Sequence, residues 1–313
     1  KIMSMKSWKD EKQNIHKGKA LGSKNGFDVI ECNNCGYKHC IPIPTKEFLE
    51  NYYKDKFVKN RPSGFYEKVE RDYPWLNILY NEKYDVFEKH IKSDSRRILD
   101  IGSGLGFFLK TGKDRGWDVC GVEASTESVE YSNRHGIDVR NFYLDKSNFS
   151  GLGTFDVVHM HEVIEHLPSP LDAVNMAAEM LCEGGLLCIA SPNDFNLLQE
   201  AFVSDDNLEK WWISPPEHIN YFDFNSIQNL LKNNGFKVLD TTTTFPLELF
   251  LLMGSNYIGN NEIGSNIHQM RVNFETNLKN SGNEFFRRKL YKNLSELGIG
   301  REFVIFAKKI SKK

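Results

Sequence analysis

The chain has 313 residues, of which 40% are hydrophobic, 26% charged and 12% aromatic, and these globular proportions exclude a disordered tail, a collagen-like repeat or a coiled coil. Lys plus Arg (40) nearly balance Asp plus Glu (42), so the composition provides no basic field for binding nucleic acid. Because no apolar run is long enough to span a membrane and no secretory signal opens the chain, we expect a cytoplasmic protein.

The N-terminal residues 1–45 contain few periodic apolar positions and carry a cysteine cluster, which predicts a small separate module. Cys32 and Cys35 form a Cys-x-x-Cys pair that is followed by His39. Zinc requires four such ligands in a tetrahedral structural site, and His16 is the only histidine upstream that can complete the set. The alternative is a degenerate knuckle that binds no metal.

Beyond this module, residues 45–91 have the periodicity of helices. From Arg97 onward, predicted strands alternate with predicted helices. Short apolar runs predict strands at 97–101, 117–122, 137–140, 155–160 and 186–190. Periodic apolar positions predict helices at 106–115, 126–135, 170–181 and 224–234. Gly184-Gly185 is expected to close the third of these helices. This alternation predicts an α/β fold with a doubly wound, mostly parallel sheet.

Two further β-prone runs, at 236–240 and 302–307, are separated by about sixty residues. If these strands pair, residues 245–300 form an insertion that covers a ligand site. The predicted division of the chain is therefore a module (1–45), a helical linker or lid (46–94), a core (95–244), a substrate cap (245–300) and the final core strand (301–313).

The strongest local signal is a strand that runs into Gly102, Gly104 and Gly106 and continues into a helix. Glycines at a strand–helix junction allow a tight turn and let a ligand approach the backbone and the helix N-terminus. Glu123 follows the second strand, where a carboxylate can accept both hydrogen bonds of a ribose diol. The three features together indicate a nucleoside-containing ligand.

The spacing and charge of the loop then select the ligand. The loop reads Gly-x-Gly-x-Gly, whereas the NAD fingerprint is Gly-x-Gly-x-x-Gly. Asp100, just before the loop, would repel a pyrophosphate but suits a ligand that bears an ammonium and a sulfonium. That ligand is S-adenosylmethionine.

These residues, with the segment 155–167 that ends in Glu-His-Leu, resemble the class I S-adenosylmethionine-dependent methyltransferases. The resemblance implies a Rossmann-like sheet of seven strands, with the last strand antiparallel beside the fifth. It also implies that the glycine loop holds the amino-acid part of the cofactor, that Glu123 holds the ribose and that the residues after the third strand border adenine. The implied cofactor-binding residues are Asp100, Gly102, Ser103, Gly104, Gly106, Glu123, Ala124, Asn141, Phe142 and His161.

The flanking segments 32–44, 211–212 and 216–222 resemble a narrower group, the bacterial methyltransferases of sugar and surface-polysaccharide pathways. This resemblance implies O-methylation of a sugar, a nucleotide sugar or a capsule precursor. The implied partner is a small, polar, carbohydrate-like acceptor rather than nucleic acid.

Two histidines are candidates for the group that takes the acceptor's proton. His218 lies beyond the fifth strand, at the edge that faces the ligand crevice in a doubly wound sheet, and His161 abuts the expected cofactor. A loop histidine bonded to the backbone is the alternative for His218. Trp211, Trp212 and Tyr221 could line an acceptor site or fill the core of a lid.

Two other functions are compatible with parts of this pattern. A nicotinamide-dependent sugar dehydrogenase or epimerase uses the same kind of sheet, although the glycine spacing argues against it. An inactive methyltransferase-like partner subunit is the second alternative, and the intact glycine loop with Glu123 argues against it.

Overall fold

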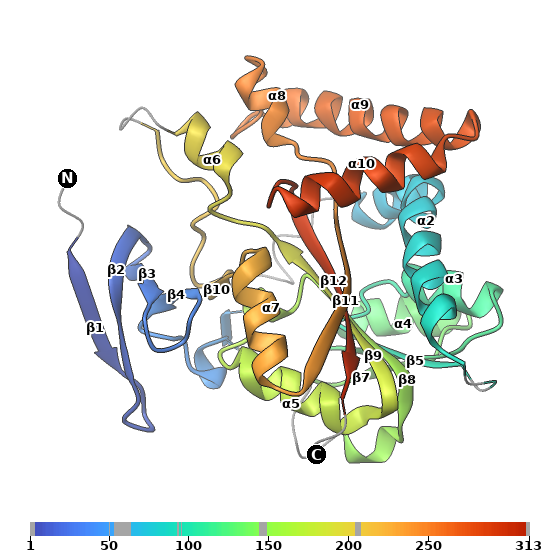
Figure 1. Ribbon diagram of the computed structural model, residues 1–313, viewed down its shortest axis with the longest axis horizontal. Coiled ribbons are helices and arrows are strands. Elements are labelled where there is room, and N and C mark those ends of the chain that lie inside the picture. Colours follow the sequence, from blue (N-terminus) through green and yellow to red (C-terminus); the bar gives the residue numbers. More distant parts are fainter. Residues whose placement is uncertain are drawn as a thin grey trace.

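The computed structural model describes residues 4–49, 51–52, 64–92, 94, 96–143, 149–203 and 208–310. Its centre is a seven-stranded sheet with helices on both faces (Figure 1). In spatial order the strands are β11 (Phe236–Thr243), β12 (Glu302–Lys309), β9 (Leu181–Pro192), β8 (Phe155–His161), β5 (Arg97–Ile101), β6 (Asp118–Glu123) and β7 (Val139–Asn141). The predicted α/β fold with a doubly wound, mostly parallel sheet is confirmed.

One strand of this sheet runs in the opposite direction to the others. β12 pairs antiparallel with β9 on one side and with β11 on the other. The late strand was expected beside the fifth strand in this orientation, and the register places Glu302 opposite Pro192. The reversed strand therefore starts at the sheet edge where the parallel strands end.

Helices cover the sheet in two layers because its strands bury side chains alternately on both faces. On β5, Leu99 packs in the core that contains α5 (Pro170–Met180) and α7 (Phe224–Asn233). Its neighbour Ile98 packs in the core of the opposite face. The helices on that face are α2 (Phe65–His90), α3 (Phe107–Asp114) and α4 (Thr126–Arg134).

The chain between β11 and β12 forms helices that lie over the end of the sheet beside α2 (Figure 1). These helices are α8 (Glu248–Leu252), α9 (Asn261–Asn280) and α10 (Glu284–Glu296). Further helical elements of the described chain are α6 (Leu197–Phe202), the short 3-10 turns η1 (Ser150–Leu152) and η2 (Ile164–His166), and the helical residues 46–49 and 51–52. No helix among the described residues is both long and apolar enough to cross a membrane.

A second, antiparallel sheet stands beside the core (Figure 1). Its strands, in order, are β1 (Met5–Lys9), β2 (Ile15–Lys24), β3 (Phe27–Cys32), β4 (Lys38–Ile41) and β10 (Asn220–Tyr221). The last of these strands comes from the far part of the chain, and its neighbour Ile219 accepts a 2.8 Å hydrogen bond from the amide of Cys40. The N-terminal strands are thus joined to the core through a backbone ladder.

The prediction that Gly184-Gly185 closes the third helix is wrong. α5 ends at Met180, and Leu181 already pairs with Phe155, so both glycines lie inside β9. The ladder between β8 and β9 shifts register here, and Gly184 has a φ of +74° that favours glycine. The glycines therefore form an irregularity in the strand.

Close packing of α3 against α2 depends on the absence of a side chain at Gly112. A Cβ atom at this position would lie 2.2 Å from the hydroxyl oxygen of the fully buried Tyr84. We expect Gly112→Ala to lower the free energy of unfolding by about 1–3 kcal/mol, because overpacking forces neighbouring groups to shift. Gly264→Ala on α9 is the matched control: its Cβ meets no atom within 4 Å, and alanine should stabilise that helix by up to about 1 kcal/mol. Denaturant midpoints measure both effects, and equal midpoints for the two variants would contradict the packing argument.

Candidate active site

The glycine loop turns sharply between β5 and α3 at the carboxyl edge of the sheet. The amides of Gly102 and Ser103 both donate to the carbonyl of Val122, at 2.8 and 3.2 Å. Gly102 has a φ of +72°, and a Cβ atom there would lie 2.5 Å from Cγ2 of Val163. Only glycine meets both conditions, so the backbone can approach a ligand closely at this point.

Glu123 binds the glycine loop to the end of β6. Its carboxylate accepts hydrogen bonds from the amide of Gly104 (3.0 Å) and the amide of Ser125 (2.8 Å). Asn141 supports the same turn, because its side-chain amide donates to the carbonyls of Glu123 and Ala124, both at 3.1 Å. The residues predicted after the first three strands are therefore brought together at one edge.

Three further predicted residues complete this edge. Ser103 is buried, and its hydroxyl has no hydrogen-bond partner among the described residues. Phe142 is half-buried and packs against the core on the α5 side of the sheet. Gly106 caps the N-terminus of α3 in the left-handed conformation, which ends the loop.

Asp100 was expected to face the ligand, and the structure places its carboxylate in the interior. Only 3% of the residue is exposed, and burial raises the pKa of its carboxyl to about 7. The carboxylate is hydrogen-bonded to Nδ1 of His159 at 2.7 Å, and Nε2 of the same ring lies 3.1 Å from the ammonium of Lys83. Burial keeps the pKa of His159 well below its usual value, so the neutral ring donates to Asp100 and accepts from Lys83.

His161, the last residue of β8, lies on the wall of a cavity at the carboxyl edge of the sheet. Its Nε2 atom is 2.8 Å from a carboxylate oxygen of Glu302, the first residue of β12. Burial and Lys83 disfavour the imidazolium, but Glu302 outweighs them and raises the pKa of His161. Burial alone would raise the pKa of the Glu302 carboxyl. The hydrogen bond and the charge of His161 have the larger effect, so the pKa of Glu302 is lowered to about 2.

The cavity itself has a volume of about 640 Å³. It lies between α2, the ends of β8, β9, β11 and β12, and the helices of residues 245–300. Its polar lining includes both signs of charge, with Lys83, Glu162, Asp240, Arg271 and Glu302 among the contributors. These charged groups stand in a wall whose exposed surface is otherwise mostly apolar.

His218, the other candidate base, does not line this cavity. Its Nδ1 atom lies 3.8 Å from a carboxylate oxygen of Asp194, which is an ion-pair distance and too long for a hydrogen bond. Burial disfavours the charged ring, but Asp194 outweighs it, so the pKa of His218 is raised. Its ring packs edge-on against His166 at 5.1 Å between centroids.

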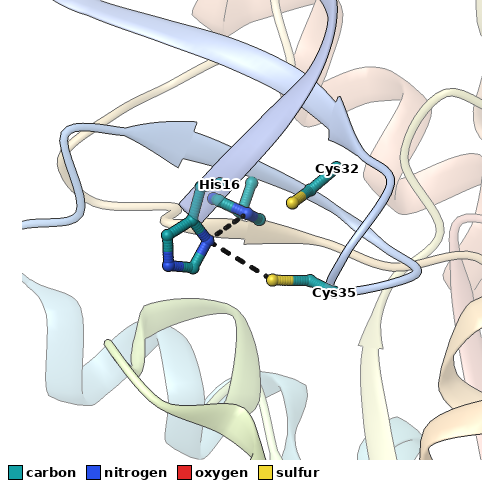
Figure 2. Close-up of side chains that lie close together, drawn as sticks. His16, Cys32 and Cys35 are labelled. Atoms are coloured by element: carbon teal, nitrogen blue, oxygen red, sulfur yellow. Dashed lines mark hydrogen bonds between the residues drawn. The ribbon is translucent and has the colours of Figure 1, made fainter. Parts of the chain in front are cut away.

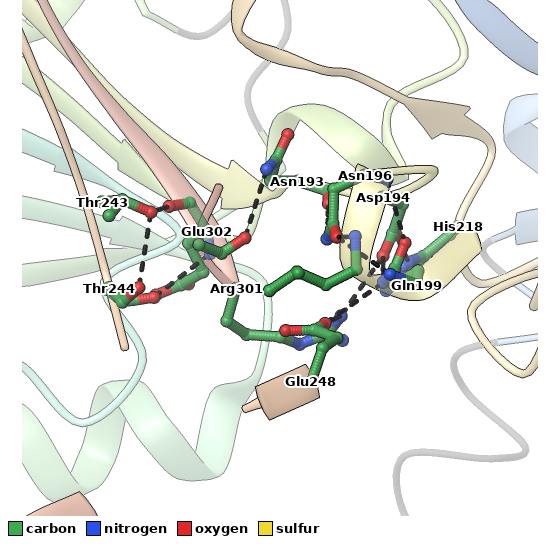
Figure 3. Close-up of polar contacts among 12 residues, drawn as sticks. Asn193, Asp194, Asn196, Gln199, His218, Thr243, Thr244, Glu248, Arg301 and Glu302 are labelled. Atoms are coloured by element: carbon green, nitrogen blue, oxygen red, sulfur yellow. Dashed lines mark hydrogen bonds and ion pairs between the residues drawn. The ribbon is translucent and has the colours of Figure 1, made fainter. Parts of the chain in front are cut away.

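Asp194 belongs to a network that fixes the chain after β9 (Figure 3). It accepts from Gln199 at 3.0 Å and from Arg301 at 3.3 Å, and Arg301 also pairs with Glu248 at 3.4 Å. Asn193 donates to the carbonyls of Gly298 and Gly300. The network joins the segments after β9, before β12 and at the start of α8, so it fixes one end of the cavity.

The glutamate and histidine of η2 form a cluster with His218 that could hold a divalent metal ion. One ligand atom from each of Glu165, His166 and His218 lies within 4.8 Å of the other two. His166 Nδ1 is hydrogen-bonded to the carbonyl of Glu217 at 2.7 Å, and its Nε2 lies 3.7 Å from Oε1 of Glu165. Oε1 of Glu165 and Nδ1 of His218 are buried without hydrogen-bond partners among the described residues, as expected of unused ligand atoms.

The four predicted metal ligands near the N-terminus converge on one point. Figure 2 shows three of them, His16, Cys32 and Cys35, close together. Ligand atoms of His16, Cys32, Cys35 and His39 all lie within 4.8 Å of one another. Nδ1 of His16 is 3.2 Å from Nε2 of His39 and 3.4 Å from Sγ of Cys35. The other nitrogen of His39 is hydrogen-bonded to the carbonyl of Cys40 at 2.9 Å, so its Nε2 is free to bind a metal.

The aromatic residues that could line an acceptor site instead fill a core. Trp212 and Tyr221 are nearly completely buried and pack with Val29 and Cys40 of the second sheet. Trp211 packs against the same cluster, and none of the three aromatic residues lines the large cavity.

No sequence pattern singled out a second group of residues around the site: Lys83, Asp194, Arg271, Arg301 and Glu302. These residues reach the site from segments far apart in the chain, and none belongs to a short motif. The one sequence feature that could have pointed to two of them is their position: Arg301 and Glu302 lie at the start of the predicted antiparallel strand 302–307.

The strand order, with a single reversed strand among those described, is that of the class I methyltransferase fold. A family model described as "Methyltransferase domain" matches residues 75–241, more than half of the sequence, and the chain belongs to this family. The solved structure of the plantazolicin methyltransferase BpumL, in complex with a pentazolic desmethylPZN analog and SAH, shares this fold. It has a TM-score of 0.50 and 16% identity, and the match covers 84% of this chain and 94% of that one.

Curated relatives are similar over part of the chain. The "Ubiquinone biosynthesis O-methyltransferase" of Caulobacter sp. (strain K31) is 30% identical over 129 residues, which cover 39% of this chain and 51% of the relative. The protein of the same name from Burkholderia orbicola (strain MC0-3) is 31% identical over 124 residues, which cover 38% and 53%. The chain thus spans about half the length of the curated relatives it matches.

The role assigned to Glu123 can be tested with ligand binding alone. We expect Glu123→Ala to weaken S-adenosylhomocysteine binding by at least about tenfold, because hydrogen bonds to a charged group contribute about 1.5–3 kcal/mol. Isothermal titration measures this effect, with NAD as the competing ligand and the exposed Glu130→Ala on α4 as the control. Tight binding of NAD, or equal S-adenosylhomocysteine affinity in both variants, would contradict the assignment.

Proposed function

We propose that this chain transfers a methyl group from S-adenosylmethionine to an oxygen atom of a small polar acceptor. The observation that carries the proposal is the closure of the glycine loop on Glu123 at the same sheet edge as the cavity containing His161. The unpartnered buried hydroxyl of Ser103 on this loop also fits a ligand-binding role. Family membership favours methyl transfer over the nicotinamide-dependent alternative.

The cofactor would be held at the edge formed by β5, β6 and β7. Glu123 is suited to the ribose hydroxyls, the backbone of residues 102–104 to the amino-acid part, and Asn141 and Phe142 to the adenine side. When bound, the sulfonium supplies an activated methyl group. The chain's own task is then to orient the acceptor oxygen and exclude water, which can contribute about 7–11 kcal/mol.

We assign the base to His161 rather than to His218 because only His161 lines the cavity. Glu302 is hydrogen-bonded to Nε2 of this ring, so Nδ1 is the atom available to take the acceptor's proton. The resulting imidazolium would be stabilised by the carboxylate of Glu302. His218, Glu165 and His166 lie outside the cavity wall, where together they are suited to hold a divalent metal ion.

The acceptor we favour is a sugar, a nucleotide sugar or a surface-polysaccharide precursor. Support comes from the mixed charges of the cavity and from the resemblance of the flanking segments to sugar methyltransferases. The curated relatives are named O-methyltransferases, which supports oxygen as the methylated atom. A screen of nucleotide sugars and sugar phosphates with methyl-labelled S-adenosylmethionine tests the acceptor class.

The ion pair of His161 makes the pH dependence of transfer a test of the base. Glu302 raises the pKa of His161, whereas burial and Lys83 lower it and the nearby Glu162 raises it weakly. We expect Glu302→Gln to lower the pKa of His161, so that the acid limb of kcat/KM moves about 1–3 pH units toward lower pH. The plateau rate should fall as well, since the base becomes weaker.

Replacement of each histidine separates the two candidates. We expect His161→Ala to reduce labelled methyl transfer by about 10²–10⁴-fold at the pH optimum while S-adenosylhomocysteine still binds. A full rate in His161→Ala, or an unmoved acid limb in Glu302→Gln, would remove His161 from this role. Loss of the acid limb in His218→Ala alone would assign the base to His218.

We further propose that His16, Cys32, Cys35 and His39 bind a structural zinc ion. Two imidazole nitrogens and two thiol sulfurs form a ligand set typical of tetrahedral zinc. Asp10 lies 3.7 Å from Nε2 of His16 and is suited to orient that ring. The cluster lies on the second sheet, away from the cavity, so its role would be structural.

Metal analysis of the purified chain tests this proposal. We expect about one zinc ion per chain, and loss of the metal with a lower melting temperature in Cys32→Ser, because a structural metal contributes to folding. Cys182→Ser is the control, since it removes a thiol from β9 outside the cluster. Equal zinc content in both variants would contradict the assignment.

A further inference from the structure

The wall that α9 adds to the cavity carries a guanidinium whose charge is not used in an ion pair of the described chain. Arg271 lines this cavity, and its buried Nε atom has no hydrogen-bond partner among the residues described. Three other cations of the cavity wall are neutralised: Arg288 by Glu82 and Asp85, Lys292 by Asp240, and Arg301 by Asp194 and Glu248. Arg271 differs from them in having a charge available for a ligand.

The guanidinium of Arg271 is held in place by neutral groups. It stacks on the ring of Trp75, with 4.5 Å from its central carbon to the ring centroid. One terminal nitrogen lies 3.4 Å from Nδ1 of His268, which accepts its hydrogen bond. The indole of Trp75 is itself fixed, because it donates to Glu275 at 2.6 Å. A cation held in this way loses little side-chain freedom when a ligand binds.

The neighbouring histidine does not compensate the charge. Nε2 of His268 donates to Asp72 at 3.1 Å, so the ring accepts at Nδ1 and is neutral. Burial lowers the pKa of His268, and the charges of Arg271 and Lys68 lower it further, against the opposing effect of Asp72. Lys68 also lines the cavity, so the positive charges of α2 and α9 act on the same region.

We propose that Arg271 binds a phosphate or carboxylate group of the methyl acceptor. A guanidinium presents several N–H donors in a planar fork that matches these oxyanions, and most donors of Arg271 have no acceptor within the described chain. The proposal rests on the proposed methyl transfer and narrows its acceptor to an anionic molecule. Phosphorylated and nucleotide-linked sugars meet this condition through phosphate, and sugar acids meet it through carboxylate.

The subsite and the proposed base belong to one cavity, so one acceptor molecule can reach both. His161 and Arg271 both contribute to its wall. The charge of Arg271 is also among the influences that lower the pKa of Glu302, the partner of His161. An acceptor anchored at α9 would therefore extend toward the end of β8.

Binding of two simple anions tests the subsite. Inorganic pyrophosphate and D-glucuronate are titrated calorimetrically into the full chain saturated with S-adenosylhomocysteine. We expect one of them to bind, and its Kd to rise at least tenfold in Arg271→Gln. The charge-matched control is Lys289→Gln, an exposed position of α10 outside the cavity wall, which should change the Kd by less than twofold. Arg271→Lys, which keeps the charge but not the fork, should give an intermediate Kd.

The outcomes separate this inference from the proposed function. Binding of pyrophosphate alone assigns a phosphate, and binding of D-glucuronate alone assigns a carboxylate. If neither anion binds, or if Arg271→Gln and Lys289→Gln bind them equally, the subsite is disproved. S-adenosylhomocysteine affinity, measured in the same samples, must stay unchanged in Arg271→Gln. Failure of the wild-type chain to bind S-adenosylhomocysteine would instead overturn the proposed methyl transfer.

Discussion

The arrangement of the site depends on one strand that runs against the others. Parallel strands deliver their last residues to the carboxyl edge of a sheet, where ligands bind in folds of this kind. β12 is antiparallel, so it delivers its first residues to that edge. As a result Glu302 meets His161 at 2.8 Å, and Arg301 meets Asp194 at 3.3 Å. A parallel final strand would place both side chains at the opposite end of the sheet.

The same reversal explains why the helices between β11 and β12 cover the site. The chain leaves β11 at Thr243 and must return to the same edge to start β12 at Glu302. The intervening helices α8, α9 and α10 therefore stay at that edge and contribute cavity residues such as Arg271 and Tyr291. Sheet topology thus determines which end of the molecule can carry an acceptor pocket.

Local sequence patterns were sufficient for most of the fold and for part of the site. Strands that are buried on both faces of the sheet appear in the sequence as short apolar runs. The glycine loop and Glu123 can be recognised from their spacing alone. The grouping of His16, Cys32, Cys35 and His39 was predictable because these four residues lie within one short N-terminal segment. Gly184-Gly185 was misread because glycine marks a strand irregularity as well as a helix end, and only the pairing of Leu181 with Phe155 distinguishes the two.

The rest of the site arises from contacts between distant segments, which a sequence pattern does not encode. Lys83 and His159 are 76 positions apart, and Trp75 and Glu275 are 200 apart. The interior position of Asp100 was missed for the same reason, because its partners come from β8 and α2. The pairing of β10 with β4 joins residues near 220 to residues near 39, so the supposedly independent N-terminal module shares its sheet with the loop that carries His218.

The ion pair between β8 and β12 also has a consequence for the order in which the molecule is assembled during synthesis. His161 and Glu302 are separated by 141 positions. A ribosome-bound fragment that ends before β12 would hold the glycine loop and Glu123, yet its His161 would have no counter-ion. The turn of the glycine loop on Glu123 can thus form early in translation, whereas the pair of His161 and Glu302 is completed only once the reversed strand has emerged and inserted between β9 and β11.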